Sequence, residues 1–291
     1  MNQEASPHST TACGPSKLPN PPCVKTASID RGQRAKWDLS RALHAWPIVI
    51  LIGTSDVSAR YRRSALGQIW ITLSLGVTVL SIGLVWAYIW KQPTQQFLPY
   101  FAVGQVIWTF MTGLITDSTT TYIEHSTYLR ELNLPRSTYL FSTMIKHLII
   151  LGHNALILPP IYIIFGVPFT LEMLLFPPAF VLTALFLFGC STMLAIVGLR
   201  FRDVSSIAGN IVGIMYFLTP VLWQLDTLPP EFATYMHFNP LAVFLELLRA
   251  PMLGQTAPTN YWWIATGLTM LVLILSFRVF ARCRARITFW L

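Results

Sequence analysis

The chain has 291 residues, of which 54% are hydrophobic and only 11% are charged. A soluble globular domain carries about 25% charged residues, so this composition excludes a soluble protein and predicts a membrane protein. The formal net charge is +8. Because basic residues that flank apolar segments mark the cytoplasmic face of a membrane, this charge does not indicate a nucleic-acid partner.

The first 36 residues are polar, contain five prolines and lack the apolar stretch of a signal peptide. This composition predicts a disordered cytoplasmic tail for residues 1–36.

Residues 37–64 mix tryptophans and aliphatic residues with charged ones, and Pro47 is expected to begin or kink a second helix there. Such a mixture predicts amphipathic helices that lie in the membrane interface, with tryptophans at headgroup depth and basic residues toward lipid phosphates. The candidate residues of this interface helix are Trp37, Trp46, Arg60, Arg62 and Arg63.

The run from Gln68 to Trp90 contains no charged residue and exceeds the length of about 20 residues that a membrane-crossing helix needs. Five further apolar runs lie between charged residues and Pro or Gly breaks, and they complete the set of candidate spans. We predict an all-α membrane protein with six transmembrane helices in one membrane domain, residues 37–291. The predicted spans are residues 68–90, 98–122, 139–165, 174–199, 207–223 and 261–280.

Six spans place both termini on the same side of the membrane. Of the 20 Lys and Arg residues, 17 fall on that side, against Lys91 and Arg249 in outer loops and Lys146 inside the third span. The positive-inside rule therefore predicts that both termini are cytoplasmic.

The outer loop of residues 224–260 is the only long one. Its part from Leu241 to Leu253 is too apolar for water and too short to cross, which predicts short re-entrant or surface helices before the last span. Glu246 and Arg249 lie three residues apart and can pair on one helical face. They form either a local ion pair or the contact of an outer gate.

No motif of an ATP-binding or hydrolytic enzyme occurs in the chain, including G-x-x-x-x-G-K-[ST]. The six histidines are scattered, and the four cysteines lack metal-ligand spacing. We predict a chain that is not an enzyme and that carries no cofactor or metal of its own.

Ionisable residues occur near the inner ends of the second and third predicted spans, where they are expected to pair across the two helices. They are Asp117, Glu124, Lys146, His147 and His153. A proton-coupled carrier places acids near mid-membrane, and this chain has none there, which argues against ion coupling.

Aromatic residues gather near the outer membrane interface. They form either an aromatic belt or the wall of an internal path on which sugar rings stack. The candidates for such a path are Tyr100, Phe101 and Trp108. The Gly209-x-x-x-Gly213 pattern permits close helix contact, either within the chain or between two copies.

Five stretches in chain order resemble the membrane subunit of the ABC-2 type polysaccharide exporters, over about residues 37–291. They are Arg60–Trp70, Leu132–Arg136, Arg200–Val204, Thr219–Val221 and Asn239–Leu241. The resemblance implies a homodimer of six-helix subunits in a bacterial inner membrane, with two copies of a separate ABC ATPase that hold the ATP and Mg²⁺. The implied substrate is a lipid-linked polysaccharide such as O antigen, capsule or teichoic acid.

In such families an inner segment acts as a coupling helix on the ATPase, and residues 128–136 match it. The resemblance assigns this contact to Tyr128, Arg130, Glu131 and Arg136. Residues 229–253 match the paired short helices that close the channel on the outside. Two alternatives stay open: an ABC-2 permease for a drug or small lipid, and a membrane glycosyl- or acyltransferase that uses Glu246 or His237.

Overall fold

The computed structural model describes residues 31–62, 64–224 and 238–291, which form helices and short connections without a β-strand. Five of its segments are long and apolar enough to cross a membrane. They are Ile69–Ile89, Thr94–Ser118, Ser137–Phe165, Leu171–Arg200 and Thr259–Trp290. The predicted all-α membrane fold is confirmed.

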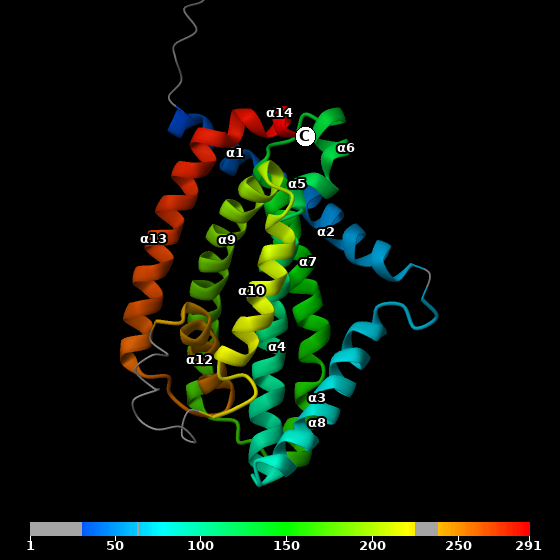
Figure 1. Ribbon diagram of the computed structural model, residues 1–291, viewed down its shortest axis with the longest axis vertical. Coiled ribbons are helices and arrows are strands. Elements are labelled where there is room, and N and C mark those ends of the chain that lie inside the picture. The colour runs from blue at the N-terminus through cyan, green and yellow to red at the C-terminus, as the bar shows by residue number, and fades with distance from the viewer. Residues whose placement is uncertain (1–30, 63, 225–237) are drawn as a thin grey trace, which may run out of the picture. The chain divides into compact units, whose positions relative to one another are not determined.

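These segments consist of individual helices that Figure 1 labels. They are α3 (Ile69–Ile89), α4 (Thr94–Ser118), α7 (Ser137–Ala155), α8 (Leu158–Phe165), η1 (Leu171–Leu175), α9 (Phe176–Arg200) and α13 (Thr259–Cys283). α4 begins one turn earlier than predicted, directly after Pro93. The third segment is interrupted at Leu156 and Ile157, just before α8, which carries Pro159 and Pro160 in its first turn.

The predicted fifth span, residues 207–223, is shorter in the structure. The apolar helix α10 (Val204–Leu218) has 15 residues, or about 22 Å, which is less than the about 30 Å of a bilayer core. It ends because Thr219 precedes Pro220 and adopts an extended backbone, with φ −97° and ψ 141°.

Two helices, α1 (Arg31–His44) and α2 (Trp46–Tyr61), precede the first span and meet at a bend of 72°. Pro47 lies in the first turn of α2, as predicted. The prediction of disorder is wrong for residues 31–36, because α1 begins at Arg31 and buries Ala35, Asp38 and Ala42 on one side. Residues 1–30 and Arg63 lie outside the described part.

The predicted outer helices are represented by α12 (Pro240–Met252), which is almost entirely buried. Asn239 caps this helix by accepting hydrogen bonds from the backbone N–H groups of Leu241 and Ala242 at 3.1 and 3.3 Å, and Pro240 occupies the first turn. Phe244 stacks on Phe186 of α9 with ring centroids 4.2 Å apart. α12 is therefore a core helix, while residues 225–237 lie outside the described part.

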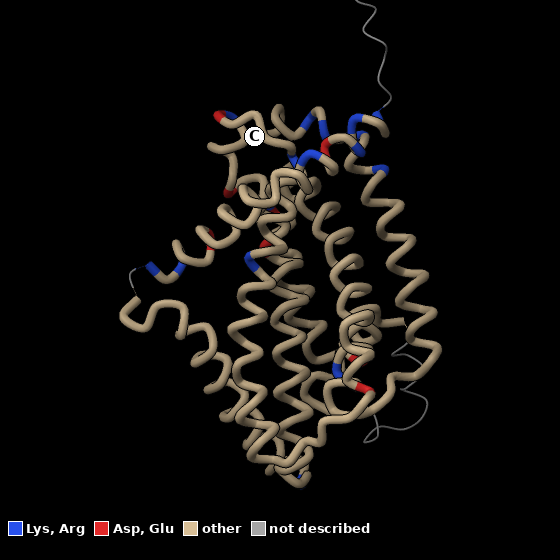
Figure 2. The backbone as a smooth tube through the Cα atoms, turned by 180° about the vertical axis from the view of Figure 1, so that it is seen from behind, with Lys and Arg blue, Asp and Glu red and all other residues tan. Residues whose placement is uncertain are grey.

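Within residues 31–291, α1 lies at the same end as the C-terminal helix α14 (Ile287–Trp290), and α12 lies toward the other end (Figure 1). Lys and Arg residues gather at the end that holds α1 and α14, which we call the basic end (Figure 2). The first and last described helices of this unit therefore lie at the same end.

Candidate functional site

The segment between α4 and α7 lies at the basic end (Figure 1). It contains α5 (Thr121–Glu124) and α6 (Ser126–Glu131), followed by an extended stretch to Pro135. In α6 only Leu129 is buried. Tyr128 is 48% exposed, and Arg130 and Glu131 are exposed as well. Three of the four predicted coupling residues therefore form an open surface.

The fourth predicted coupling residue, Arg136, lies where α7 begins, and the carboxylate of Asp38 holds this point in place. Asp38 accepts hydrogen bonds from the backbone N–H groups of Arg136 and Ser137 at 3.3 and 3.0 Å, and from the Ser137 hydroxyl at 2.7 Å. It also pairs with Nε of Arg284 at 2.6 Å. Asp38 is only 1% exposed and connects α1, the start of α7 and the segment after α13.

Residues at the end of the chain contact the predicted coupling segment, residues 128–136. Arg130 donates from Nη2 to the carbonyl oxygen of Leu291 at 2.7 Å, and Arg136 donates to the hydroxyl of Thr288 at 3.3 Å. A groove of about 390 Å³ separates α6 from α9 and α14, and its lining includes Arg130, Glu131, Arg202 and Trp290. Two of the predicted coupling residues, Arg130 and Glu131, thus share one groove with Arg202 of the Arg200–Val204 motif.

A histidine links α2 to the turn between α5 and α6. Nε2 of His125 lies 3.2 Å from Oδ2 of Asp56, and Nδ1 lies 2.8 Å from the carbonyl oxygen of Thr121. Burial lowers the pKa of His125, but the hydrogen bonds to Asp56 and Thr121 outweigh burial and raise it above its ordinary value. A protonated His125 therefore strengthens the link between α2 and the turn between α5 and α6.

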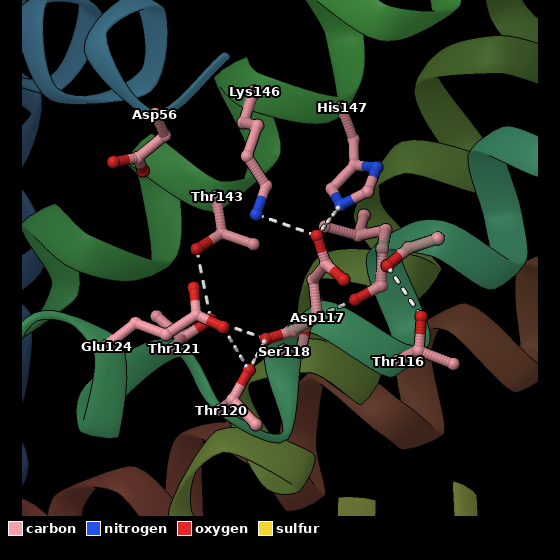
Figure 3. Close-up of polar contacts among 12 residues, drawn as sticks. Asp56, Thr116, Asp117, Ser118, Thr120, Thr121, Glu124, Thr143, Lys146 and His147 are labelled. Atoms are coloured by element: carbon pink, nitrogen blue, oxygen red, sulfur yellow. Dashed lines mark hydrogen bonds and ion pairs between the residues drawn. The ribbon is translucent and has the colours of Figure 1, made fainter. Parts of the chain in front are cut away.

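The ion pair predicted between the second and third spans is present. Figure 3 shows Lys146 and His147 of α7 pointing toward Asp117 of α4. Oδ2 of Asp117 lies 2.7 Å from Nζ of Lys146 and 3.1 Å from Nε2 of His147. Pairing makes the charges tolerable inside a membrane segment.

The other two members of the predicted intramembrane set have local partners. Glu124 accepts a hydrogen bond from the hydroxyl of Thr120 at 2.7 Å, and Nδ1 of His153 lies 2.9 Å from the carbonyl oxygen of Ile149. Next to Asp117, the hydroxyls of Thr121 and Thr143 lie 3.0 Å apart and add a second contact with α7 (Figure 3).

At the end opposite the basic end, Arg249 of α12 is 1% exposed and surrounded by partners. It pairs with Glu246, donates to the carbonyl oxygen of Pro220 at 2.6 Å, and lies 3.8 Å above the ring of Tyr100. Tyr100 also donates to the carbonyl oxygen of Trp223 at 3.1 Å. The local ion pair of Glu246 and Arg249 is confirmed, and their role as an outer gate stays a prediction.

These residues border a pocket of about 690 Å³ with a polar wall. Amides, hydroxyls and one ion pair can donate to and accept from a ligand rich in hydroxyl groups. The polar and aromatic lining residues are Gln95, Gln96, Tyr100, Gln224, Glu246, Arg249, Gln255, Thr256 and Tyr261. Sequence reasoning missed the glutamines, since isolated amides near a membrane interface carry no pattern.

Of the three aromatic candidates for a path, only Tyr100 reaches this pocket. Phe101 is fully buried and stacks with Phe97 at 6.1 Å between ring centroids. Trp108 is 5% exposed and packs against Tyr216 of α10 at 5.7 Å. The structure therefore places Phe101 and Trp108 in the core of the subunit. Within the described residues, no group of three or more His, Cys, Asp or Glu could hold a metal ion.

The motifs Thr219–Val221 and Asn239–Leu241 meet beside Arg249. The side-chain amide of Asn239 donates to the hydroxyl of Thr219 at 3.0 Å, and Pro220 accepts from Arg249. Two motifs that are separated by 17 residues in the sequence thus hold the buried helix α12 against the end of α10.

Comparison with known proteins points in one direction. Residues 49–253, more than half of the chain, match the family described as ABC-2 type transporter. The O-antigen export system permease protein RfbA of Klebsiella pneumoniae is 24% identical over 246 residues, which cover 80% of this chain and 91% of the relative. RfbA of Myxococcus xanthus is 22% identical over 233 residues, which cover 78% of this chain and 88% of the relative. With its apolar helices and the five motifs in order, this chain belongs to the ABC-2 type transporter family.

Proposed function

We propose that this chain is the channel-forming membrane subunit of an ATP-driven exporter that moves a lipid-linked polysaccharide out of the cytoplasm. O antigen is the first candidate substrate, because the relatives are named O-antigen export permeases. The observation that carries the proposal is the exposed helix α6 at the basic end, with Arg130 and Glu131 beside a groove that also contains Arg202.

The partner in this proposal is a separate ABC ATPase in two copies, which holds the ATP and Mg²⁺. Its closure would push on α6 and the start of α7. Because Asp38 bonds to Arg136, Ser137 and Arg284, such a push moves α1, α7 and the end of α13 together. The pairing of Asp117 with Lys146 extends the connection from α7 to α4.

A homodimer is proposed because α10 has an exposed face that is ill suited to lipid. Gly209 and Gly213 have no atoms within 4 Å of an added Cβ, and Asn210 between them is exposed. An amide without a partner is costly in hydrocarbon, whereas two helices that meet at small residues can bond across the contact. A wet path for a long glycan would run at the interface between two such subunits.

The positive-inside rule places the basic end in the cytoplasm of a bacterial cell with this protein in its inner membrane. The outer pocket then faces the exterior. There, the contacts of Arg249 with Glu246, Pro220 and Tyr100 hold α12 in place and form the proposed outer gate.

The test uses the organism's own strain in which the gene is deleted and then restored. Deletion is expected to remove surface polysaccharide and to accumulate lipid-linked glycan inside the cell. The double reversal Arg130→Glu/Glu131→Arg is expected to insert in the membrane but to lose the co-purifying ATPase and surface glycan. Lys91→Glu reverses an exposed charge outside the basic end and serves as the control that keeps both.

Normal surface polysaccharide in the deletion strain, combined with lost export of a drug or small lipid, would contradict the proposed substrate. An ATPase that still binds the α6 double reversal as tightly as the unaltered chain would contradict the proposed coupling surface.

A further inference from the structure

Five arginines surround one small pocket at the basic end, apart from α6 and its groove. The pocket has a volume of about 200 Å³, and its walls come from α1 and from the end of α13 with the turn η3 (Arg284–Arg286). Besides the arginines it is lined only by Ala281 and Ala285, which leave space between the long side chains. The arginines are Arg31, Arg34, Arg282, Arg284 and Arg286.

Most of this positive charge has no counterion in the described part of the chain. Asp38 is the acid that contacts these arginines, and its carboxylate already pairs with Arg284 and accepts a hydrogen bond from the start of α7. The other four arginines make no hydrogen bond or ion pair with any described residue, and all four are exposed. Like charges that share a pocket repel each other, so the arrangement favours an anion between them.

Buried contacts hold the two walls of the pocket together. The ion pair of Arg284 with the buried Asp38 joins η3 to α1, and Ala35 of α1 packs in one core cluster with Phe280 and Ile287. Arg34 and Arg286 therefore project from elements that are held together, and the pocket is part of the fold rather than a chance meeting of flexible side chains.

The position of the pocket indicates the source of the anion. The apolar segment Thr259–Trp290 could cross the membrane. Arg282, Arg284 and Arg286 near its end indicate where it leaves the hydrocarbon core of the bilayer. Phosphate groups of lipids lie at this depth. The planar guanidinium group binds phosphate oxygens with two parallel hydrogen bonds, and basic pockets between membrane helices bind anionic headgroups.

We propose that this pocket binds the phosphate group of an anionic lipid headgroup from the leaflet at the basic end. The bound headgroup neutralises the arginines and holds α1 against the end of α13. Because Arg284 connects through Asp38 to the start of α7, the same lipid also stabilises the origin of the coupling segment. This inference is independent of which substrate the exporter moves.

The test uses the full chain in lipid nanodiscs of phosphatidylcholine with or without phosphatidylglycerol. Retained lipid is counted by native mass spectrometry, and thermal stability is measured in both mixtures. The variant Arg34→Gln/Arg286→Gln removes one arginine from each wall. The control Lys91→Gln/Arg278→Gln removes two exposed basic residues that line neither this pocket nor the groove beside α6, so the two variants have equal charge.

Phosphatidylglycerol is expected to be retained by the unaltered chain and the control and to raise their melting temperatures. In the pocket variant its binding should weaken by at least about tenfold, since two charged hydrogen-bonding partners are lost. Arg34→Lys/Arg286→Lys should lie between the two, because it keeps the charge but not the paired hydrogen bonds. Equal retention in the pocket variant and the control would overturn the proposal.

Inorganic pyrophosphate in lipid-free detergent distinguishes the source of the phosphate. If phosphatidylglycerol raises the melting temperature and pyrophosphate does not, the bound phosphate belongs to a lipid headgroup in the membrane. If pyrophosphate stabilises the unaltered chain but not the pocket variant, the pocket binds phosphate groups, and a free anion is their source. A pocket variant that keeps its lipid but loses the co-purifying ATPase would overturn the lipid site in favour of a protein contact.

Discussion

Asp38 of α1 and Arg284 of η3 lie 246 residues apart in the sequence and form an ion pair with 2.6 Å between Oδ2 and Nε. The same carboxylate bonds to two backbone N–H groups where α7 begins. One buried acid therefore connects the first described helix, the start of α7 and the turn η3.

Asp38→Asn is expected to destabilise the protein because the ion pair is lost and an amide can no longer accept all four hydrogen bonds. The loss should be about 1–3 kcal/mol, which corresponds to a fall in melting temperature of roughly 2–12 °C for a chain of this size. Thermal unfolding in detergent measures it. Asp203→Asn changes an exposed acid at the start of α10 and should shift melting little; equal shifts would contradict the role of Asp38.

Asp117 and Lys146 are expected to depend on each other. Asp117→Asn leaves the Lys146 ammonium, whose side chain is 11% exposed, without its counterion. The double variant Asp117→Asn/Lys146→Met removes both charges and should recover part of the lost stability. A double-mutant cycle on melting should give a coupling energy of about 1 kcal/mol or more, whereas strictly additive effects would show that the pair does not stabilise the contact of α4 with α7.

Gly198 allows α9 to approach the backbone after α4. A Cβ at this position would overlap the carbonyl oxygen of Thr119 and lie 2.9 Å from its carbonyl carbon. Gly198→Ala should therefore destabilise the protein by about 2 kcal/mol or more, because backbone atoms cannot move aside as a side chain can. Gly152→Ala, where a Cβ meets open space, is the matched control and should be neutral or slightly stabilising. Similar expression and melting of both variants would refute the close contact.

The contact of His125 with Asp56 should make stability depend on pH. The pKa of His125 in the folded protein is raised above the ordinary value of 6.5, so protonated His125 contributes stability that is complete below pH 6.5. This contribution is lost as the pH rises through the folded pKa. Charged and aromatic neighbours from other elements are Asp56 and Glu124, with the Tyr128 and Tyr139 rings beside the imidazole.

Melting temperatures between pH 5.5 and 8.5 measure this effect, with Asp56→Asn as the comparison. The difference between the unaltered chain and Asp56→Asn should be largest at pH 5.5 and shrink above pH 6.5. A difference that is constant over this range would show that the protonation of His125 does not strengthen the contact.

The sequence alone was sufficient for most of the helices. Gln68 to Trp90 is uncharged over its length, and α3 extends from Ile69 to Ile89, because the cost of charge in lipid makes a membrane helix visible in composition. The pairing of Asp117 with Lys146 and His147 was also predictable, since a charge inside a span needs a partner at the same depth.

The three candidate residues for a substrate path have different surroundings in the structure. Tyr100, Phe101 and Trp108 look alike in sequence, yet Tyr100 borders the pocket beside Arg249 while Phe101 and Trp108 are core residues. Which face of α4 meets α3, α10 or the pocket depends on packing between helices, and a helix that is apolar on all sides gives no periodic signal of its orientation.

Composition determined that the chain crosses a membrane and which end is basic. The reason is that the free energy of transferring a residue from water to lipid depends mainly on the type of that residue. The tertiary structure decided that Asp38 meets Arg284, that α12 is buried, and that five arginines from α1 and the end of α13 enclose one pocket. Those contacts join residues far apart in the chain, and only the packing of the helices brings them within bonding distance.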